Sequence, residues 1–388
     1  YIELSLDYAD VGMYDEAACV LQRLLEEYSV NSVSVNPMAY YYLGWYYEKS
    51  GDSGCAQEYY KKGAAAKPDF CFPNKLSDII VLESAIKSNP SDAKAYCYLG
   101  NLWYDKKQYS EAIKCWEKSK DIDDTFPTVH RNLSLAYYNK LKDTKAAMSA
   151  LERAFELDPY DSRVFFELDQ LYKRIGVSIS ERLSRLEKHK YLVESRDDLY
   201  IEYITLLNLT GDFEKAYSLI MKRKFHPWEG GEGKVTKQYV LSLIEIGKKH
   251  LRSKNYACAL DVLTRAVIYP PNLGEGKLSG AQENDLNFYI GCAYEGLGEN
   301  EKARECFGKA SSGLDEPGNV MFYNDVPPEM IFYQGLAHIN LGELEKAKEK
   351  FNKLINYGEN HLHDNVTIDY FAVSLPDFLI FDDDLNKR

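Results

Sequence analysis

Residues 37–68 read PMAYYYLGWYYEKSGDSGCAQEYYKKGAAAKP, and this stretch decides the fold. Small and aromatic residues recur at helical spacing on both sides of a turn at Gly51. Gly44 allows the first helix to approach the second closely, Ala56 supplies a small partner surface, and aromatic rings fill the remaining space. Pro68 ends the second helix. The spacing therefore predicts two antiparallel helices whose apolar face needs a neighbour to cover it.

This pattern resembles one tetratricopeptide repeat (TPR), a pair of helices in about 34 residues. Similar patterns recur clearly in the ranges 93–124, 127–159, 240–271, 284–310 and 328–357, and more weakly in 162–194 and 197–224. One such repeat does not bury its own apolar face, so neighbouring repeats are expected to stack. We therefore predict an all-α fold, a right-handed α-solenoid (superhelix) of about eight or nine TPR-type helical pairs.

The repeats also predict the organisation of the chain. It divides into a partial repeat at 1–36, a complete repeat at 37–68, a loop with an extra helix at 69–92, three repeats at 93–194, three repeats with long loops rich in Gly and Glu at 195–310, one repeat at 328–357, and a tail or the start of a further repeat at 358–388. Gly247, Gly291 and Gly335 are each 44 residues apart, which indicates a longer unit in the second half. Because the sequence opens within a helix-like pattern, we expect a piece of a longer protein.

The composition argues against several classes of function. The 388 residues carry a net charge of −13 and a pI near 5.2, which disfavours binding to nucleic acids. No run of about 18 apolar residues is present, so we expect no membrane partner. The eight cysteines include no Cys-x-x-Cys pair, which favours reduced thiols in a cytoplasmic protein over a disulfide framework or a zinc site. The 32 tyrosines fit an aromatic-rich repeat core better than an enzyme fold.

Two loops, within 228–234 and 272–277, share the tetrapeptide Gly-Glu-Gly-Lys. They fall in successive connections between repeats, so stacking is expected to place them side by side. Glycine permits close approach of a ligand or another chain, and an aromatic ring beside carboxylates is typical of sugar binding. The residues predicted to bind a ligand or partner are Trp228, Glu229, Glu232, Lys234, Glu275 and Lys277. The alternative is that the loops only share turn chemistry, with Trp228 packed inward and the glutamates capping the following helices.

A second candidate surface is the concave groove expected along the first helix of each repeat. Its predicted residues are Tyr41, Trp45, Asn101, Tyr104, Arg131, Asn132, Tyr138, Arg163 and Gln170. Amides pair with the backbone of an extended peptide and cations pair with its carboxylates, so this set suits a peptide or a domain. Asn101, Asn132 and Arg163 also match three of five positions that clamp a C-terminal carboxylate in related repeats, but Cys97 and Glu167 occupy the other two. A merely solvated face is the alternative.

No residue pattern indicates catalysis. His361, His363 and Asp364 alternate along the tail, a spacing that rarely holds a metal by itself. No Ser-His-Asp or Cys-His arrangement stands out. We therefore predict no catalytic residue, no metal site and no cofactor.

Residues 69–388 also resemble the repeat half of large bacterial TPR proteins that carry an uncharacterised β-rich domain ahead of the repeats. The resemblance rests on the stretches 137–140, 167–173, 225–234, 272–277, 282–285 and 370–377. The run Phe-His-Pro-Trp-Glu-Gly-Gly-Glu-Gly that begins at Phe225 is specific. The resemblance implies a further repeat after the tail, and it associates the family only loosely with carbohydrate metabolism.

Two functions follow from these observations. The first is a non-catalytic TPR scaffold that binds a peptide, a partner protein or a companion domain of the same polypeptide. The alternative is an accessory domain whose loops complete a carbohydrate or cation site beside a catalytic domain. A β-rich neighbour with an acidic pocket in the full-length protein would favour the accessory domain, whereas a bare repeat protein would favour peptide binding.

Overall fold

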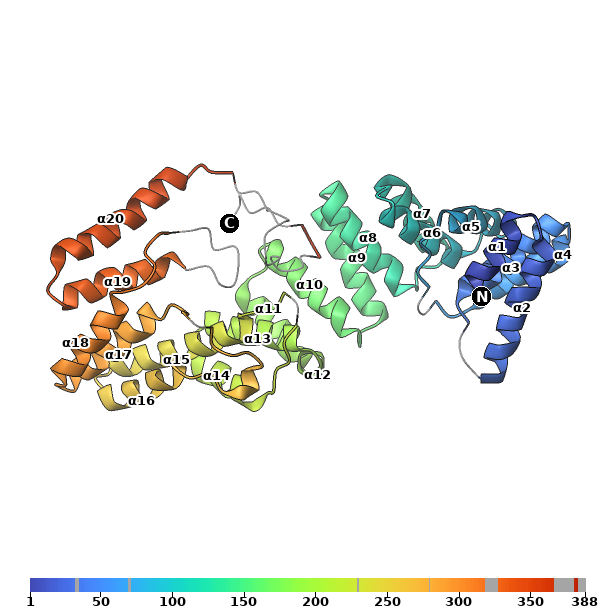
Figure 1. Cartoon of the computed structure of the whole chain (residues 1–388). Helices are drawn as coiled ribbons and strands as arrows, with labels where there is room; N and C mark the ends of the chain where they lie inside the picture. The colour runs from blue at the N-terminus through green and yellow to red at the C-terminus, as the bar shows by residue number, and fades with distance from the viewer. Residues whose placement is uncertain are drawn as a thin grey trace. The chain divides into compact units, whose positions relative to one another are not determined.

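The computed structural model describes residues 1–31, 35–68, 71–228, 230–278, 280–317, 327–365 and 380–382. In these ranges the chain forms twenty α-helices and no strand (Figure 1). The prediction of an all-α fold is therefore confirmed. The chain divides into two compact units, Tyr1–Val164 and Phe165–Arg388, which we describe separately.

The first unit consists of helices that pack in consecutive pairs. They are α1 (Ile2–Asp10), α2 (Tyr14–Asn31), α3 (Pro37–Ser50), α4 (Ser53–Ala65), α5 (Leu76–Ser88), α6 (Ala93–Asp105), α7 (Tyr109–Ile122), α8 (Pro127–Ala136) and α9 (Thr144–Leu157), with a π-helical turn η1 (Tyr137–Leu141) after α8. The pairs α3–α4, α6–α7 and α8–α9 follow the helix-turn-helix pattern of the repeats. The extra helix α5 packs against both α3 and α6, so it lies between two repeats.

The second unit continues with the same arrangement. Its helices are α10 (Ser162–Arg174, within which the unit boundary falls), α11 (Ile179–Lys188), α12 (Lys190–Ser195), α13 (Asp197–Leu209), α14 (Phe213–Lys222), α15 (Lys234–Arg252), α16 (Tyr256–Ala266), α17 (Asn284–Gly296), α18 (Asn300–Ala310), α19 (Pro328–Asn340) and α20 (Leu344–His361), with a short 3₁₀ turn η2 (Pro271–Leu273) after α16. The pairs α15–α16, α17–α18 and α19–α20 each form a helical hairpin. None of the described helices is long and apolar enough to cross a membrane.

Five helical pairs close on a glycine of the first helix. In each pair this glycine faces a bulky side chain of the second helix, sixteen residues further along the chain. The pairs are Gly44 with Tyr60, Gly100 with Trp116, Gly247 with Leu263, Gly291 with Phe307 and Gly335 with Phe351. A methyl group at Gly100, for example, would stand 2.6 Å from the indole ring of Trp116. The expected role of Gly44 in the close approach of two helices is thus confirmed, and it recurs in both units.

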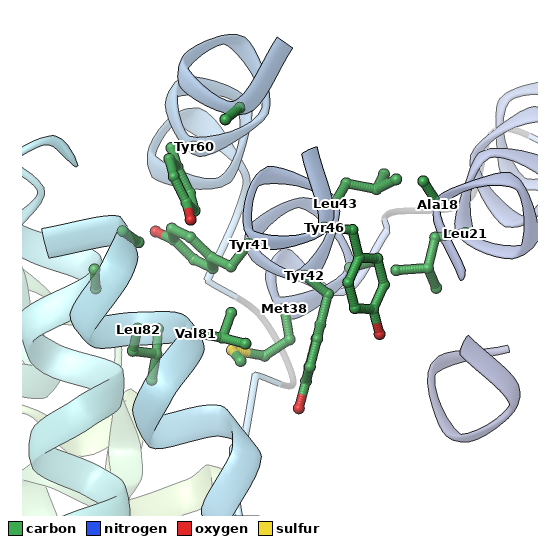
Figure 2. Packing of buried hydrophobic residues seen from close by; sticks show 14 of the residues in the cluster. Ala18, Leu21, Met38, Tyr41, Tyr42, Leu43, Tyr46, Tyr60, Val81 and Leu82 are labelled. Carbon is green, nitrogen blue, oxygen red and sulfur yellow. The ribbon is translucent and has the colours of Figure 1, made fainter. Parts of the chain in front are cut away.

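The core around α3 explains the high tyrosine content. Figure 2 shows Leu43 pointing toward Ala18 of α2, while Met38 points toward Val81 of α5. These side chains are almost completely buried. Helix α3 therefore contacts helices on two sides, and this is the neighbour that its apolar face requires.

Buried tyrosines of this core keep partners for their hydroxyl groups. Tyr42 donates a hydrogen bond of 2.6 Å to Asp78, and the hydroxyls of Tyr46 and Ser5 lie 2.9 Å apart. Burial raises the pKa of Tyr46 to about 12. The rings fill apolar space while their polar ends stay satisfied, which suits tyrosine to the interior of stacked helices.

A buried ion network joins α10, α11 and α13 within the second unit. Arg182 donates to Asp169 over 3.0 and 2.6 Å and to Glu202 over 2.6 Å, and its side chain is only 4% exposed. Burial raises the pKa of Asp169. Burial acts in the same direction on Glu202, but attraction to Lys173 and Arg182 outweighs it and lowers the pKa of that carboxyl. The guanidinium group thus compensates both carboxylates, and Lys173 also pairs with Glu202 at 3.5 Å.

Candidate functional site

Three of the predicted groove residues meet on the facing surfaces of α6 and α8 in the first unit. The amide nitrogen of Asn132 donates a hydrogen bond of 2.9 Å to the amide oxygen of Asn101. Arg131 donates to the amide oxygen of Asn132 over 3.3 Å. All three side chains are half-buried, so they are held in place while part of each remains accessible. The bond between the two amides shows that the first helices of these two successive repeats lie side by side.

The indole group of Trp116 stabilises this arrangement. Trp116 of α7 is buried, and its Nε1 donates to the same Asn101 oxygen over 3.0 Å. Tyr104, another predicted groove residue, packs its ring 5.3 Å from that of Trp116 and 5.0 Å from that of Tyr109. We call Asn101, Tyr104, Arg131 and Asn132 the α6–α8 surface. It combines an aromatic floor, two amides and one guanidinium group, which can bind peptide backbone and carboxylates.

Trp116 was not among the predicted site residues, although the sequence contains a signal for it. It stands sixteen residues after Gly100, at the position that faces the glycine in other pairs. A tryptophan at that position brings an N–H donor into an otherwise apolar contact, and that donor reaches the first helix of its own repeat. The bond to Asn101 therefore follows from the repeat geometry together with the residue type.

Tyr41 does not belong to the groove, which corrects the prediction. Its side chain has an exposed fraction of 0%, and its hydroxyl donates a hydrogen bond of 2.9 Å to Asp92. The ring lies against Gly63, where a methyl group would stand 2.9 Å away. The glycine leaves room for the ring to turn inward, so Tyr41 fills the interior between repeats. Trp45 is half-buried and packs edge-on against Tyr14 at 5.8 Å.

The other groove residues belong to later elements of the chain. Tyr138 is half-buried within η1, and Arg163 is exposed at the start of α10. Gln170 is half-buried and belongs to the second unit. A continuous groove that includes these three residues stays a prediction.

The two loops with the shared tetrapeptide lie side by side, as the stacking argument predicted. The backbone N–H of Phe225 donates to the carbonyl of Asn272 over 2.8 Å. The side chain of Asn272 donates in turn to the carbonyls of Ile220 and Arg223, over 2.9 and 3.0 Å. A methyl group at Gly274 would stand 2.7 Å from the Phe225 carbonyl oxygen, so glycine permits this close approach.

Glu275 links the loops through its carboxylate. Both of its oxygens accept from the backbone N–H of Gly233, over 3.0 and 3.2 Å, and Gly233 is the N-cap residue of α15. Burial raises the pKa of this carboxyl, although the bond from Gly233 opposes the shift. A carboxylate at this position compensates the free N–H groups and the positive end of the helix dipole. For Glu275, this geometry favours a capping role, but the capped helix is α15, which follows the other loop, and not the next helix in the sequence as the alternative expected.

The remaining loop residues have mixed environments. Trp228 is half-buried and covers Gly231, while Glu232 is exposed. Lys277 donates to the carbonyl of Val267 over 3.1 Å and pairs with Glu283 at 2.5 Å. Lys234 is half-buried at the start of α15, and Glu229 lies outside the described residues. A carbohydrate or cation site at these loops stays a prediction.

A depression that the sequence did not predict lies over α8 and α9. It has a volume of about 480 Å³ and is lined by charged residues of both signs, among them Lys120, Asp124, His130, Arg153 and Glu156. Arg153 donates to the Asp124 carboxylate over 3.0 Å, and His130 Nε2 lies 3.2 Å from its other oxygen. The charges of this depression compensate one another, so they indicate no particular class of ligand.

Groups that bind metals or form disulfides are not assembled in the described part of the chain. It contains no cluster of three or more His, Cys, Asp or Glu side chains able to hold a metal ion. The eight cysteines, all of which are described, are free thiols. Burial raises the pKa of Cys71 to about 12 and that of Cys115 to about 11, which keeps these thiols protonated and unreactive.

Comparison with curated proteins gives a short match. Human Superkiller complex protein 3 is 26% identical to this chain over 99 residues, which are 24% of this chain and 6% of that protein. The chain therefore spans only a small part of the length of this relative.

Solved structures with similar helical arrangements include three TPR proteins. One from Parabacteroides merdae is 13% identical, with a TM-score of 0.35 over 80% of this chain and 98% of its own. YrrB, described as a TPR protein with an unusual peptide-binding site, is 18% identical, with a TM-score of 0.33 over 59% of this chain and 90% of its own. TTC0263 from Thermus thermophilus is 19% identical, with a TM-score of 0.30 over 53% and 96%.

Family models locate the repeats directly. Models described as tetratricopeptide repeat match residues 2–69, 132–161, 285–312 and 329–357, and a model described as TPR repeat matches residues 100–140. These ranges lie in both units and overlap helical pairs of the structure. The chain therefore contains tetratricopeptide repeats in each of its two units, as the spacing of its small and aromatic residues predicted.

Proposed function

We propose that the chain is a non-catalytic scaffold that binds an extended segment of a partner protein along the α6–α8 surface. The observation that supports this proposal is the amide–amide bond between Asn101 and Asn132, which lie on the first helices of two successive repeats. The bond aligns polar groups of neighbouring helices in one row. An extended peptide presents alternating N–H and C=O groups along its length, and such a row can pair with them.

The surface is organised before a partner arrives. The amide oxygen of Asn101 accepts from both Trp116 and Asn132, which fixes the orientation of this amide group. The half-buried position of these side chains has already restricted their rotamers, which lowers the entropy lost on binding. Arg131 adds a cation beside the amides, and this favours a segment that carries a carboxylate.

Selection from a displayed peptide library tests the proposal. The intact chain is used as bait, and enriched peptides are measured by fluorescence anisotropy against the chain with Asn101→Ala and Asn132→Ala. A matched control carries Gln57→Ala and Lys118→Ala, which replace exposed side chains of the same unit. We expect the Asn double variant to bind at least tenfold more weakly and the control to bind as the intact chain does.

Stability separates a binding effect from a folding effect. Each variant is melted while circular dichroism is recorded, and we expect both to melt within a few degrees of the intact chain. If the enriched peptides bind the Asn double variant as tightly as the intact chain, the α6–α8 surface is not the binding site and the proposal is wrong.

A further inference from the structure

Residues 380–382 lie against α10, although they are about two hundred positions away in the sequence. The Nε of Arg174 donates a hydrogen bond of 3.2 Å to the carbonyl of Phe381. The Phe381 side chain is only 1% exposed, whereas Ile380 is half-buried and Asp382 is exposed. Figure 1 draws this short segment in red beside the helix. The three residues thus present a buried aromatic anchor, a backbone acceptor and an accessible carboxylate.

The segment lies on a face of α10 that includes a residue of the predicted groove. Arg174 is four residues after Gln170, and residues four apart share one face of a helix. Gln170 is one of the predicted groove residues and is half-buried. A guanidinium group that binds a backbone carbonyl does not discriminate between sequences, whereas burial of the phenyl ring supplies selectivity.

We propose that this face of α10 is a docking site for a short segment with an aromatic residue followed by an acidic one. Residues 380–382 occupy the site as an internal ligand. A partner segment of the same chemistry binds by displacing them. The inference goes beyond the α6–α8 surface, because Arg174 and Phe381 both belong to the second unit.

Covalent connection to the site gives the internal segment an advantage over a free peptide. A tethered ligand acts at an effective concentration that reaches about the millimolar range for short flexible connections. A free peptide of identical sequence therefore binds the intact chain more weakly than it binds a chain whose internal anchor has been removed. This difference is the measurable signature of internal occupancy.

A labelled peptide of residues 377–385 (DFLIFDDDL) tests the proposal by fluorescence anisotropy. We expect Phe381→Ala in the chain to tighten binding of this peptide at least tenfold, because the site becomes vacant. Adding Arg174→Ala to that variant is expected to weaken binding at least fivefold. Lys188→Ala serves as the matched control, because Lys188 is an exposed cation of the same unit, and it is expected to change nothing. A peptide with alanine in place of Phe381 is expected not to bind.

A cross-linking measurement covers the case in which Phe381→Ala disturbs folding. Asp382→p-benzoylphenylalanine places a photoreactive group at the exposed position of the otherwise intact chain. We expect cross-links to α10, and we expect an excess of the 377–385 peptide to reduce them.

Several outcomes would overturn the inference. Equal peptide affinity of the intact and Phe381→Ala chains would do so, as would absence of binding to both. Absence of cross-links to α10 would do the same. None of these outcomes bears on the α6–α8 surface, because Asn101→Ala with Asn132→Ala is expected to leave binding of the 377–385 peptide unchanged.

Discussion

Two glycines of one repeat should respond in opposite ways to the same substitution. Gly291 lies in α17 and Gly308 lies in α18. A methyl group at Gly291 would stand 2.6 and 2.8 Å from ring atoms of Phe307, which is only 3% exposed. A methyl group at Gly308 meets no atom within 4 Å. The pair therefore separates the effect of helix propensity from that of helix packing.

The expected magnitudes follow from these distances. Replacing glycine by alanine inside a helix stabilises it by about 0.5–1 kcal/mol, and this gain applies to both variants. At Gly291 the added methyl also overpacks the contact with Phe307, whose ring is held by Phe288 at a centroid distance of 5.9 Å. Overpacking of this kind costs about 1–3 kcal/mol. We expect Gly308→Ala to raise the free energy of unfolding by about 0.5–1 kcal/mol and Gly291→Ala to lie about 1–3 kcal/mol below it.

Urea unfolding followed by circular dichroism measures both variants. Two further variants are Phe307→Leu alone and Phe307→Leu combined with Gly291→Ala. The smaller leucine side chain should relieve the clash with the added methyl group, so Gly291→Ala should cost less stability in this background. If Gly291→Ala is as stable as Gly308→Ala, the ring of Phe307 does not constrain the approach of the two helices, and the packing argument for the repeat fails.

The remaining predictions concern buried or capping charges. Arg182→Met leaves the buried Asp169 without its cation and Glu202 with Lys173 alone, and it should lower the free energy of unfolding by about 3–5 kcal/mol in urea unfolding. Lys188 on the same helix is exposed, so Lys188→Met should change this free energy by about 0.5 kcal/mol or less. Glu275→Gln should lower the free energy of unfolding by about 0.5–2 kcal/mol because it weakens a helix cap, while Glu232→Gln, at an exposed position, should have almost no effect. If both variants keep their stability but abolish docking of a ligand or domain, the loops form a binding site. Burial raises the pKa of Asp285 to about 6, so the folded chain loses stability as the pH rises from about 4 to about 6. In thermal melts at several pH values, Asp285→Asn should remove this loss, and a pH profile identical to that of the parent would contradict the prediction.

Local spacing was enough to predict the helical pairs. Glycine on one helix and a bulky residue sixteen positions later define both the length of the hairpin and the face that closes it, as Gly100 and Trp116 illustrate. Stacking of repeats then followed from the apolar surface that each pair leaves uncovered. These features depend on residues within about 34 positions of one another, and a repeated sequence displays them many times.

Tertiary structure decided which of the predicted groove residues are buried and which stay partly accessible. Tyr41 and Asn101 both lie on first helices of repeats, yet the tyrosine turns inward over Gly63 while the asparagine meets its neighbour in the next repeat. The direction of each side chain depends on the volume left by residues of another helix, and spacing along its own helix does not report that volume.

The sequence also did not predict which distant segments of the chain contact one another. Glu275 caps a helix 42 residues earlier, and Arg174 binds the backbone of Phe381 across 207 residues. Such bonds use groups that every loop possesses, a carboxylate, an N–H or a carbonyl, so no residue pattern distinguishes the partner that is finally chosen. The choice is made when stacked helices bring particular loops within about 3 Å, because hydrogen bonds form only at that range.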